Sequence, residues 1–322
     1  MLNIKSLIPA VALAAAGLLG AEASAAEGVT KALKDTEWSW EGPFGSYDQR
    51  MLQRGFQVYR EVCANCHSLE LIAFRHLGEK GGPFYLEKCP EELGLPDTVD
   101  CSNPISNPVV KSLAAEFTVT DGPDEFGDMF ERPGIPADYY PSIYANKQQA
   151  IAANGGAYPP DQSLLVKARP NGADYMYSLL TGYPEMDPEV LDVPPGQYYN
   201  PFYPGDSTGL LKAEYLDETG YPLKKKIKEM TDEKYLSDEG YIYGGAFKMS
   251  QPLYDEMVEY TDGTPMTMEQ YAKDVTAFLM WAAEPKLEQR KSMGSFVMVY
   301  LIIFAGVTYM SYKRVWSNVG KS

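Results

Sequence analysis

Apolar positions form two long uncharged stretches near the ends of the chain and several short periodic segments between them. The first stretch, residues 7–20, is too short to cross a bilayer, whereas residues 292–312 contain no charged side chain. A helix needs about 20 apolar residues to span the hydrocarbon. The pattern therefore predicts one transmembrane anchor at residues 292–312. Basic residues flank it equally on both sides, so their bias does not orient it.

The N-terminal stretch has the features of a secretory signal peptide. Lys5 gives a weakly positive start, and Ala23-Ser24-Ala25 is a small-residue cleavage site before Ala26. A mitochondrial transit peptide would be rich in Arg, and this segment has none. We therefore expect residues 1–25 to be removed and the mature chain to be exported to the periplasmic side of a bacterial membrane.

Export also orients the anchor. It places residues 26–291 in the periplasm, residues 292–312 in the inner membrane as a single pass, and residues 313–322 in the cytoplasm.

The segments between the two ends predict a mainly α, loop-rich domain. Apolar periodicity indicates helices at about 48–62, 69–78, 109–116, 146–153, 173–181 and 268–283. Strand-like alternation is scarce, and no internal repeat is evident. The 24 Pro, 28 Gly and 24 Tyr residues favour long irregular connections.

The pentapeptide Cys63-Ala64-Asn65-Cys66-His67 carries the clearest chemical signal. It reads Cys-x-x-Cys-His, the attachment signature for a covalent c-type haem. The two thiols bond the haem vinyl groups, and His67 is placed to ligate the iron. A zinc site would need a second ligand pair, and a thioredoxin-like pair would need a βαβ unit. Neither context is present, so we predict one covalently attached haem c.

Cys89 and Cys101 remain after the haem takes its pair. Disulfides persist in an oxidising compartment, so we expect these two to form a structural disulfide. The segment between them reads as a surface excursion.

The sixth iron ligand is not decided by the residues alone. His76 is the only other histidine, and a helical 67–76 segment would place it roughly 13 Å from His67 along the axis. We therefore interpret His76 as a packing residue. Methionines in irregular segments are the remaining candidates: Met186, Met249, Met266 and Met268.

Several longer segments resemble the cytochrome c1 family, the haem subunit of ubiquinol–cytochrome c oxidoreductase (complex III). The matching segments include Arg54-Gly55-Phe56-Gln57-Val58-Tyr59, Asp121-Gly122-Pro123, Arg132-Pro133-Gly134, Ala157-Tyr158-Pro159-Pro160-Asp161, Asp174-Tyr175-Met176-Tyr177 and Trp281-Ala282-Ala283-Glu284-Pro285. They span most of the mature chain. The resemblance implies a c-type cytochrome domain with insertions, in a bacterial protein.

The resemblance also assigns site residues. The family's axial Met precedes a Pro-Leu-Tyr-like segment, which implies Met249 as the ligand opposite His67. Arg169 matches the arginine that pairs with a haem propionate. Asn154 and Tyr175 match positions near the propionates.

The resemblance further implies partners. They are cytochrome b, the Rieske iron–sulfur protein, and a soluble or membrane-tethered cytochrome c, in a dimeric complex. The chain itself would be a redox subunit with no bond-making chemistry of its own.

Residues 207–246, with the cluster Lys224-Lys225-Lys226, depart from shorter family members. We hypothesise that this insertion shields the loop carrying Met249 and keeps the potential high. The lysine cluster reads as a solvated face.

Charge points to a basic partner. The net charge is −16, with acidic clusters at 121–131, 185–192 and 217–218. Such a surface disfavours nucleic acid and steers a basic electron carrier towards it.

Three functions remain open from the residues. The first is an electron-transfer subunit of complex III. The second is a haem peroxidase or sensor with an open distal position. The third is a membrane-bound cytochrome that serves another oxidase or a photosynthetic reaction centre.

Overall fold

The computed structural model describes residues 29–96 and 98–317. The predicted signal peptide, residues 1–25, lies outside them. The helices of four residues or more are α2 (Gln49–Glu61), α3 (Phe74–Leu77), α4 (Pro108–Ala115), α5 (Lys147–Ala153), α6 (Gly172–Leu180), α7 (Lys224–Met230), α8 (Met268–Ala283) and α9 (Leu287–Trp316). Two small antiparallel sheets pair β1 (Thr118–Asp121) with β2 (Phe130–Pro133) and β3 (Tyr198–Asn200) with β4 (Gly245–Phe247). The mainly α, loop-rich fold class is confirmed.

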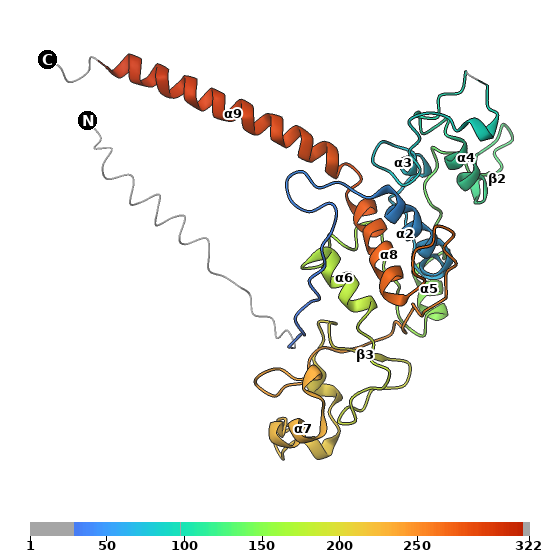
Figure 1. Cartoon of the computed structure of the whole chain (residues 1–322). Coiled ribbons are helices and arrows are strands. Elements are labelled where there is room, and N and C mark those ends of the chain that lie inside the picture. The colour runs from blue at the N-terminus through green and yellow to red at the C-terminus, as the bar shows by residue number, and fades with distance from the viewer. Residues whose placement is uncertain (1–28, 97, 318–322) are drawn as a thin grey trace.

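Helices α2 and α8 pack side by side at the centre of the domain (Figure 1). Gly55 is at their contact, because a Cβ there would lie 2.0 Å from the carbonyl oxygen of Asp274. Around this contact Phe56 and Tyr59 on α2 pack against Phe278 on α8 at centroid distances of 5.5 and 5.6 Å. Phe56, Tyr59 and Phe278 therefore belong to the main apolar core, at the contact between the two helices.

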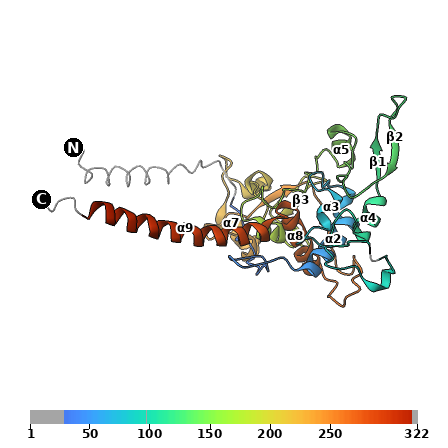
Figure 2. The ribbon, with the colours of Figure 1, turned by 90° about the horizontal axis from the view of Figure 1, so that it is seen from above.

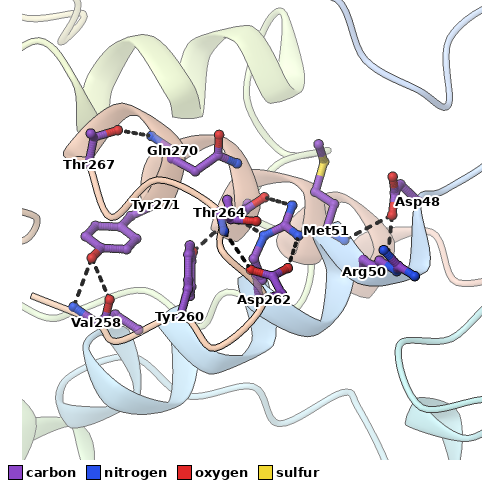
Figure 3. A network of polar contacts seen from close by, with 12 residues as sticks. Asp48, Arg50, Met51, Val258, Tyr260, Asp262, Thr264, Thr267, Gln270 and Tyr271 are labelled. Atoms are coloured by element: carbon purple, nitrogen blue, oxygen red, sulfur yellow. Dashed lines mark hydrogen bonds and ion pairs between the residues drawn. The ribbon is translucent and has the colours of Figure 1, made fainter. Parts of the chain in front are cut away.

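Both central helices begin at the residues that the sequence predicts. The Asp48 carboxylate accepts hydrogen bonds from the amides of Arg50 and Met51, and the Thr267 hydroxyl accepts one from the amide of Gln270 (Figure 3). Such side chains satisfy amides that have no partner within the helix.

A buried ion pair joins α2 to α8. Arg54 donates from Nε and Nη2 to the two oxygens of Asp274, at 2.8 and 3.1 Å, and from Nη1 to Asp262 at 2.8 Å. Asp274 is fully buried, and Tyr260 also donates to it at 3.0 Å. Figure 3 shows Tyr260 and Asp262 on the loop that leads into α8. This loop is thereby bound to both helices.

The predicted helix at 69–78 is wrong over most of its length. Only α3 is helical, because residues 69–73 make a turn and a bridge between Ala73 and Tyr139 instead. The other five predicted helices are present, with ends displaced by one residue at most. Local periodicity does not foresee the pairing with residue 139, which is distant in the sequence.

The segment that precedes β4 is a separate unit with its own apolar cluster. Val190, Leu191, Tyr199, Tyr215, Ile227, Leu236 and Ile242 form this cluster. It begins before the predicted insertion at 207–246, because residues 190–199 contribute to the same core. In Figure 1 this unit, with α7, lies below the central helices.

This unit contains an internal repeat, contrary to the expectation from the sequence. Residues 212–223 and 232–243 each begin with a 3₁₀ turn and continue into a hairpin closed by a bridge, Leu216–Pro222 in one and Leu236–Ile242 in the other. The turn glycines Gly220 and Gly240 both have φ of 84°. The pattern Tyr-Leu-x-x-x-Gly-Tyr occurs at residues 215–221 and again at residues 235–241, so the sequence also carries the repeat.

The excursion around residues 89–101 is closed by the predicted disulfide. Cys89 and Cys101 are bonded, with their Cα atoms 5.1 Å apart. This pairing is confirmed.

The acidic cluster at 121–131 forms an exposed hairpin of β1 and β2, which projects from the body on the side away from α9 (Figure 2). Asp121 is paired with Arg132. No salt bridge within residues 29–96 and 98–317 engages Asp124, Glu125, Asp128 or Glu131.

The long apolar C-terminal helix is confirmed. Helix α9 has 30 residues and a mean hydropathy of 1.9 over its most apolar window, and it leaves the domain as a single rod (Figure 2). It contains the predicted anchor at 292–312 and continues through Trp316 into the predicted tail. By length and composition it is a candidate membrane span.

Candidate haem-binding site

The Cys-x-x-Cys-His segment forms a tight turn directly after α2. Residues 63–65 are a 3₁₀ turn, and the amides of Cys66 and His67 both donate to the Cys63 carbonyl oxygen, at 3.1 and 2.9 Å. Both thiols are free. Burial and the neighbouring Cys66 raise the pKa of the Cys63 thiol to about 12. The turn therefore presents two thiols and an imidazole from five consecutive residues.

The His67 imidazole is oriented by a backbone carbonyl. Its Nδ1 lies 2.8 Å from the carbonyl oxygen of Pro160. Because a carbonyl oxygen only accepts, Nδ1 carries the proton and Nε2 presents its lone pair, the form in which imidazole binds metals. Burial lowers the pKa of His67, which favours the neutral ring. Pro160 was not predicted as a site residue, and only the bond to His67 reveals its role.

Met249 follows β4 and packs half-buried against the same apolar core as Cys63. The register of β4 against β3 determines where this methionine enters the core, with Phe247 opposite Tyr198. The structure thus packs the Met249 thioether and the Cys63 thiol against one apolar core, although the two residues are 186 positions apart.

The other candidate methionines are placed differently. Met186 is 83% exposed and Met266 is 39% exposed. Met268 is half-buried at the start of α8, where its sulfur accepts from the Gln251 amide at 3.5 Å. Met249 is the candidate that is both packed on this core and free of such a bond within the described part of the chain.

Arg169 and Tyr175 lie close together. Arg169 is exposed, and the one hydrogen bond that its guanidinium makes in the described residues goes to the carbonyl of Ala168. Tyr175 is buried on α6, where desolvation raises its pKa while the positive charge of Arg169 opposes the shift. A guanidinium with no carboxylate partner in this part of the chain suits an incoming carboxylate such as a propionate.

Asn154 and His76 are occupied by local bonds. The Asn154 amide donates to the Tyr144 hydroxyl at 2.9 Å and to the Ala150 carbonyl at 2.7 Å, at the end of α5. His76 accepts from the Ala73 amide at 3.1 Å through Nδ1. The interpretation of His76 as a packing residue agrees with this bond, although its premise of a 67–76 helix was wrong.

These residues fit a covalently attached haem. Two thiols lie on one turn beside an imidazole with a free lone pair, and a thioether approaches the same core. Tyr158 and Leu164, on either side of Pro160, are 53% and 50% exposed. Such exposed apolar side chains beside the donors are suited to covering a flat apolar ring system.

Two residues near Met249 were missed from the sequence. The Tyr183 hydroxyl donates to the Met249 carbonyl at 2.9 Å, and Lys248 Nζ donates to the Gly155 carbonyl at 2.8 Å. Neither residue belongs to a ligand motif, so only the fold could identify them.

The chain matches known proteins over most of its length. The Cytochrome C1 family matches residues 38–319. A cytochrome c1 from Rhodospirillum rubrum is 40% identical over 96% of this chain and 97% of that protein. A mitochondrial cytochrome c1 heme protein from Saccharomyces cerevisiae is 39% identical over 88% of this chain and 71% of that protein. A cytochrome b/c1 from Bradyrhizobium diazoefficiens is 41% identical over 96% of this chain, which spans 39% of that longer protein.

Proposed function

The chain belongs to the cytochrome c1 family, the electron-transfer subunits of the cytochrome bc1 complex, and from that premise we propose that it binds one covalent haem c between His67 and Met249. The observation that carries the proposal is the turn at 63–67, in which the Pro160 carbonyl holds the His67 ring with Nε2 free. Cys63 and Cys66 would hold the cofactor by thioether bonds. When bound, haem c supplies a one-electron ferric–ferrous couple.

The chain's own residues would tune that couple. Neutral His67 and the Met249 thioether favour the ferrous state and a high potential. Arg169 would neutralise a propionate, with Tyr175 and Asn154 lining the same edge. The central core between α2 and α8 would exclude water from the buried side of the ring.

We propose that one partner protein donates electrons to the haem and another accepts them. Electrons would come from the Rieske iron–sulfur protein and leave to a soluble or membrane-tethered cytochrome c. The relative in which cytochromes b and c1 form one protein supports cytochrome b as a neighbour in the membrane. The complex would be a dimer.

The proposal also assigns each segment of the chain to a cellular compartment. Residues 26–291 would lie in the periplasm of a bacterium, α9 would cross the inner membrane once, and the tail would be cytoplasmic. Removal of residues 1–25 by signal peptidase would precede haem attachment.

Haem attachment is tested on the two cysteine pairs. The chain is expressed with its export signal, denatured in detergent and stained for haem on a gel. We expect the stain to stay with the wild-type chain and to disappear in the double variant Cys63→Ser/Cys66→Ser. The matched control, Cys89→Ser/Cys101→Ser, keeps it. Haem that leaves the wild-type chain on denaturation would contradict covalent attachment.

A further inference from the structure

The segment Phe247-Lys248-Met249 is held by a separate contact at each of its three residues. The Phe247 ring stacks on Tyr203, with centroids 4.6 Å apart and planes at 16°. Lys248 Nζ donates to the Gly155 carbonyl at 2.8 Å. The Met249 carbonyl accepts from the Tyr183 hydroxyl at 2.9 Å. Strand pairing of β4 ends at Phe247, and among the described residues the last two contacts are the hydrogen bonds that hold the segment beyond the sheet.

Tyr183 is held beside Met249 by aromatic contacts of its own ring. Its ring lies 5.9 Å from that of Phe247, in the same aromatic cluster as Tyr203. Burial raises the pKa of Tyr183 well above its ordinary range, and the neighbours Tyr175 and Tyr254 act in the same direction. The hydroxyl therefore stays protonated and remains a donor to the Met249 carbonyl at all ordinary pH values.

Lys248 packs closely against the turn formed by Gly155 and Gly156. Gly155 and Gly156 have φ of 59° and 88°, and a Cβ on Gly156 would lie 2.8 Å from Lys248 Nζ. The ammonium thereby joins the Met249 segment to the turn that follows Asn154.

We propose that Tyr183 and Lys248 are positioning residues for the axial methionine: their bonds to the Met249 carbonyl and the Gly155 carbonyl hold its backbone so that the thioether stays on the iron. This inference rests on Met249 being the ligand. The bond between iron and a neutral thioether sulfur is weak, so a rigid backbone around Met249 helps to keep this ligand bound. Loss of either bond enlarges the fraction of molecules in which the sixth position is open.

Imidazole binding to the oxidised, haem-loaded full chain in detergent measures that fraction. Its apparent affinity is the intrinsic affinity multiplied by the fraction of molecules with an open position. One hydrogen bond contributes modestly to stability, so Tyr183→Phe is expected to raise the apparent association constant roughly threefold to tenfold. The Met-to-iron absorption band weakens in parallel.

Tyr199→Phe is the matched control. Tyr199 also donates from its hydroxyl to a backbone carbonyl, that of Tyr243 at 2.7 Å, in the same unit but not at Met249. We expect its imidazole affinity to stay within twofold of the wild type. Equal affinities in Tyr183→Phe and Tyr199→Phe would overturn the role of Tyr183.

Lys248→Met gives a second, independent readout, which decides the matter if Tyr183→Phe does not accumulate. Lys248 is exposed, so its loss does not disturb the core. Its control is Lys226→Met, because Lys226 Nζ donates to the Glu214 carbonyl at 2.9 Å away from the site. Lys248→Met should bind imidazole more tightly than Lys226→Met. Equal imidazole affinities in the two variants would overturn the positioning role of Lys248.

The wild-type spectrum separates this inference from the proposed function. A wild-type chain without a Met-to-iron band would refute Met249 as the ligand. A wild-type chain with that band and variants that bind imidazole equally would refute only the positioning role.

Discussion

At the residue scale, the proposal makes Met249 the residue that closes the sixth position of the iron. Met249→Leu removes the thioether, so the potential should fall and carbon monoxide should bind the reduced protein rapidly. Visible spectra detect the loss of the thioether ligand, redox titration measures the potential, and gas binding measures the reaction with carbon monoxide. Met186→Leu is the matched control, because Met186 is 83% exposed in a loop and was an equal candidate from composition. A Met-ligated spectrum in Met249→Leu would contradict the assignment.

Asp262 gives a prediction for acid stability. Hydrogen bonds from the Thr264 hydroxyl and amide, and then from Arg54, lower the pKa of Asp262 from its ordinary 3.8 to about 2. A depressed folded-state pKa stabilises the fold above pH 3.8, and this contribution is lost as the pH falls through about 2. Asp262→Asn should therefore melt earlier than the wild type at pH 7, and the gap should narrow between pH 4 and pH 2. Melting curves followed by Trp fluorescence would test this, and a gap independent of pH would contradict it.

The haem-attachment signature is recognisable in the sequence, because Cys63, Cys66 and His67 lie within five consecutive residues. Their role as haem donors stays a prediction. Met249 is far from them, and composition alone left four methionines open. Pro160, Tyr183 and Lys248 act through a backbone carbonyl or a single side-chain bond, which leaves no sequence signature.

At the scale of elements, the pair α2–α8 depends on the ion pair of Arg54 with Asp274. Asp274→Asn should destabilise the domain by about 3 kcal/mol or more, because it leaves a nearly buried guanidinium with only Asp262 as a charged partner. Urea unfolding measures the change. Asp232→Asn is the control, since its pair with Lys234 is exposed and exposed pairs contribute about 1 kcal/mol or less. Equal effects in the two variants would contradict the role of this pair.

The disulfide stabilises the surface segment between residues 89 and 101 and does not affect the candidate haem site. Replacement of both Cys89 and Cys101 by Ser should lower the free energy of unfolding by roughly 2–3 kcal/mol, from the entropy of the closed loop. The visible spectrum should remain unchanged, because the excursion does not contact the Cys63–His67 turn in any described hydrogen bond. A shifted Met-to-iron band in that variant would contradict this separation.

Elements with local causes were predicted well. Helices 49–61 and 268–283 have a capping side chain and an apolar face, and both were expected within one residue. The repeat at 212–223 and 232–243 was missed although the pattern Tyr-Leu-x-x-x-Gly-Tyr occurs in both copies, at 215–221 and 235–241. The bridge of Ala73 to Tyr139 was missed because its partner is distant in the sequence.

At the scale of the whole molecule, the exposed β1–β2 hairpin offers unpaired carboxylates to a basic carrier. Asp124→Asn/Glu125→Gln/Asp128→Asn should slow the bimolecular reduction of cytochrome c about threefold or more at low salt, and flatten its dependence on ionic strength. Stopped-flow rates over a salt series measure this. The control is Asp238→Asn/Glu239→Gln, which changes two exposed acids on the repeat unit. Equal salt dependence in both variants would exclude the hairpin as the docking surface.

The order of a haem domain followed by a C-terminal apolar helix was predictable, because it depends on features that extend over many residues. A 30-residue apolar helix and a chain-wide family resemblance do not depend on any single contact. The extent of the unit that contains the repeat was not predictable, because residues 190–199 pack with core residues about 50 positions away. Charge indicated a basic partner but not which acidic cluster is unpaired.

The central claim is that this chain relays electrons from the iron–sulfur protein to a soluble cytochrome c. The most direct test mixes quinol with the purified native complex and follows the haem c absorbance of this subunit. We predict rapid reduction, loss of that reduction when the iron–sulfur protein is removed, and reoxidation on addition of oxidised cytochrome c. Reduction at the same rate without the iron–sulfur protein, or no reoxidation by cytochrome c, would contradict the account.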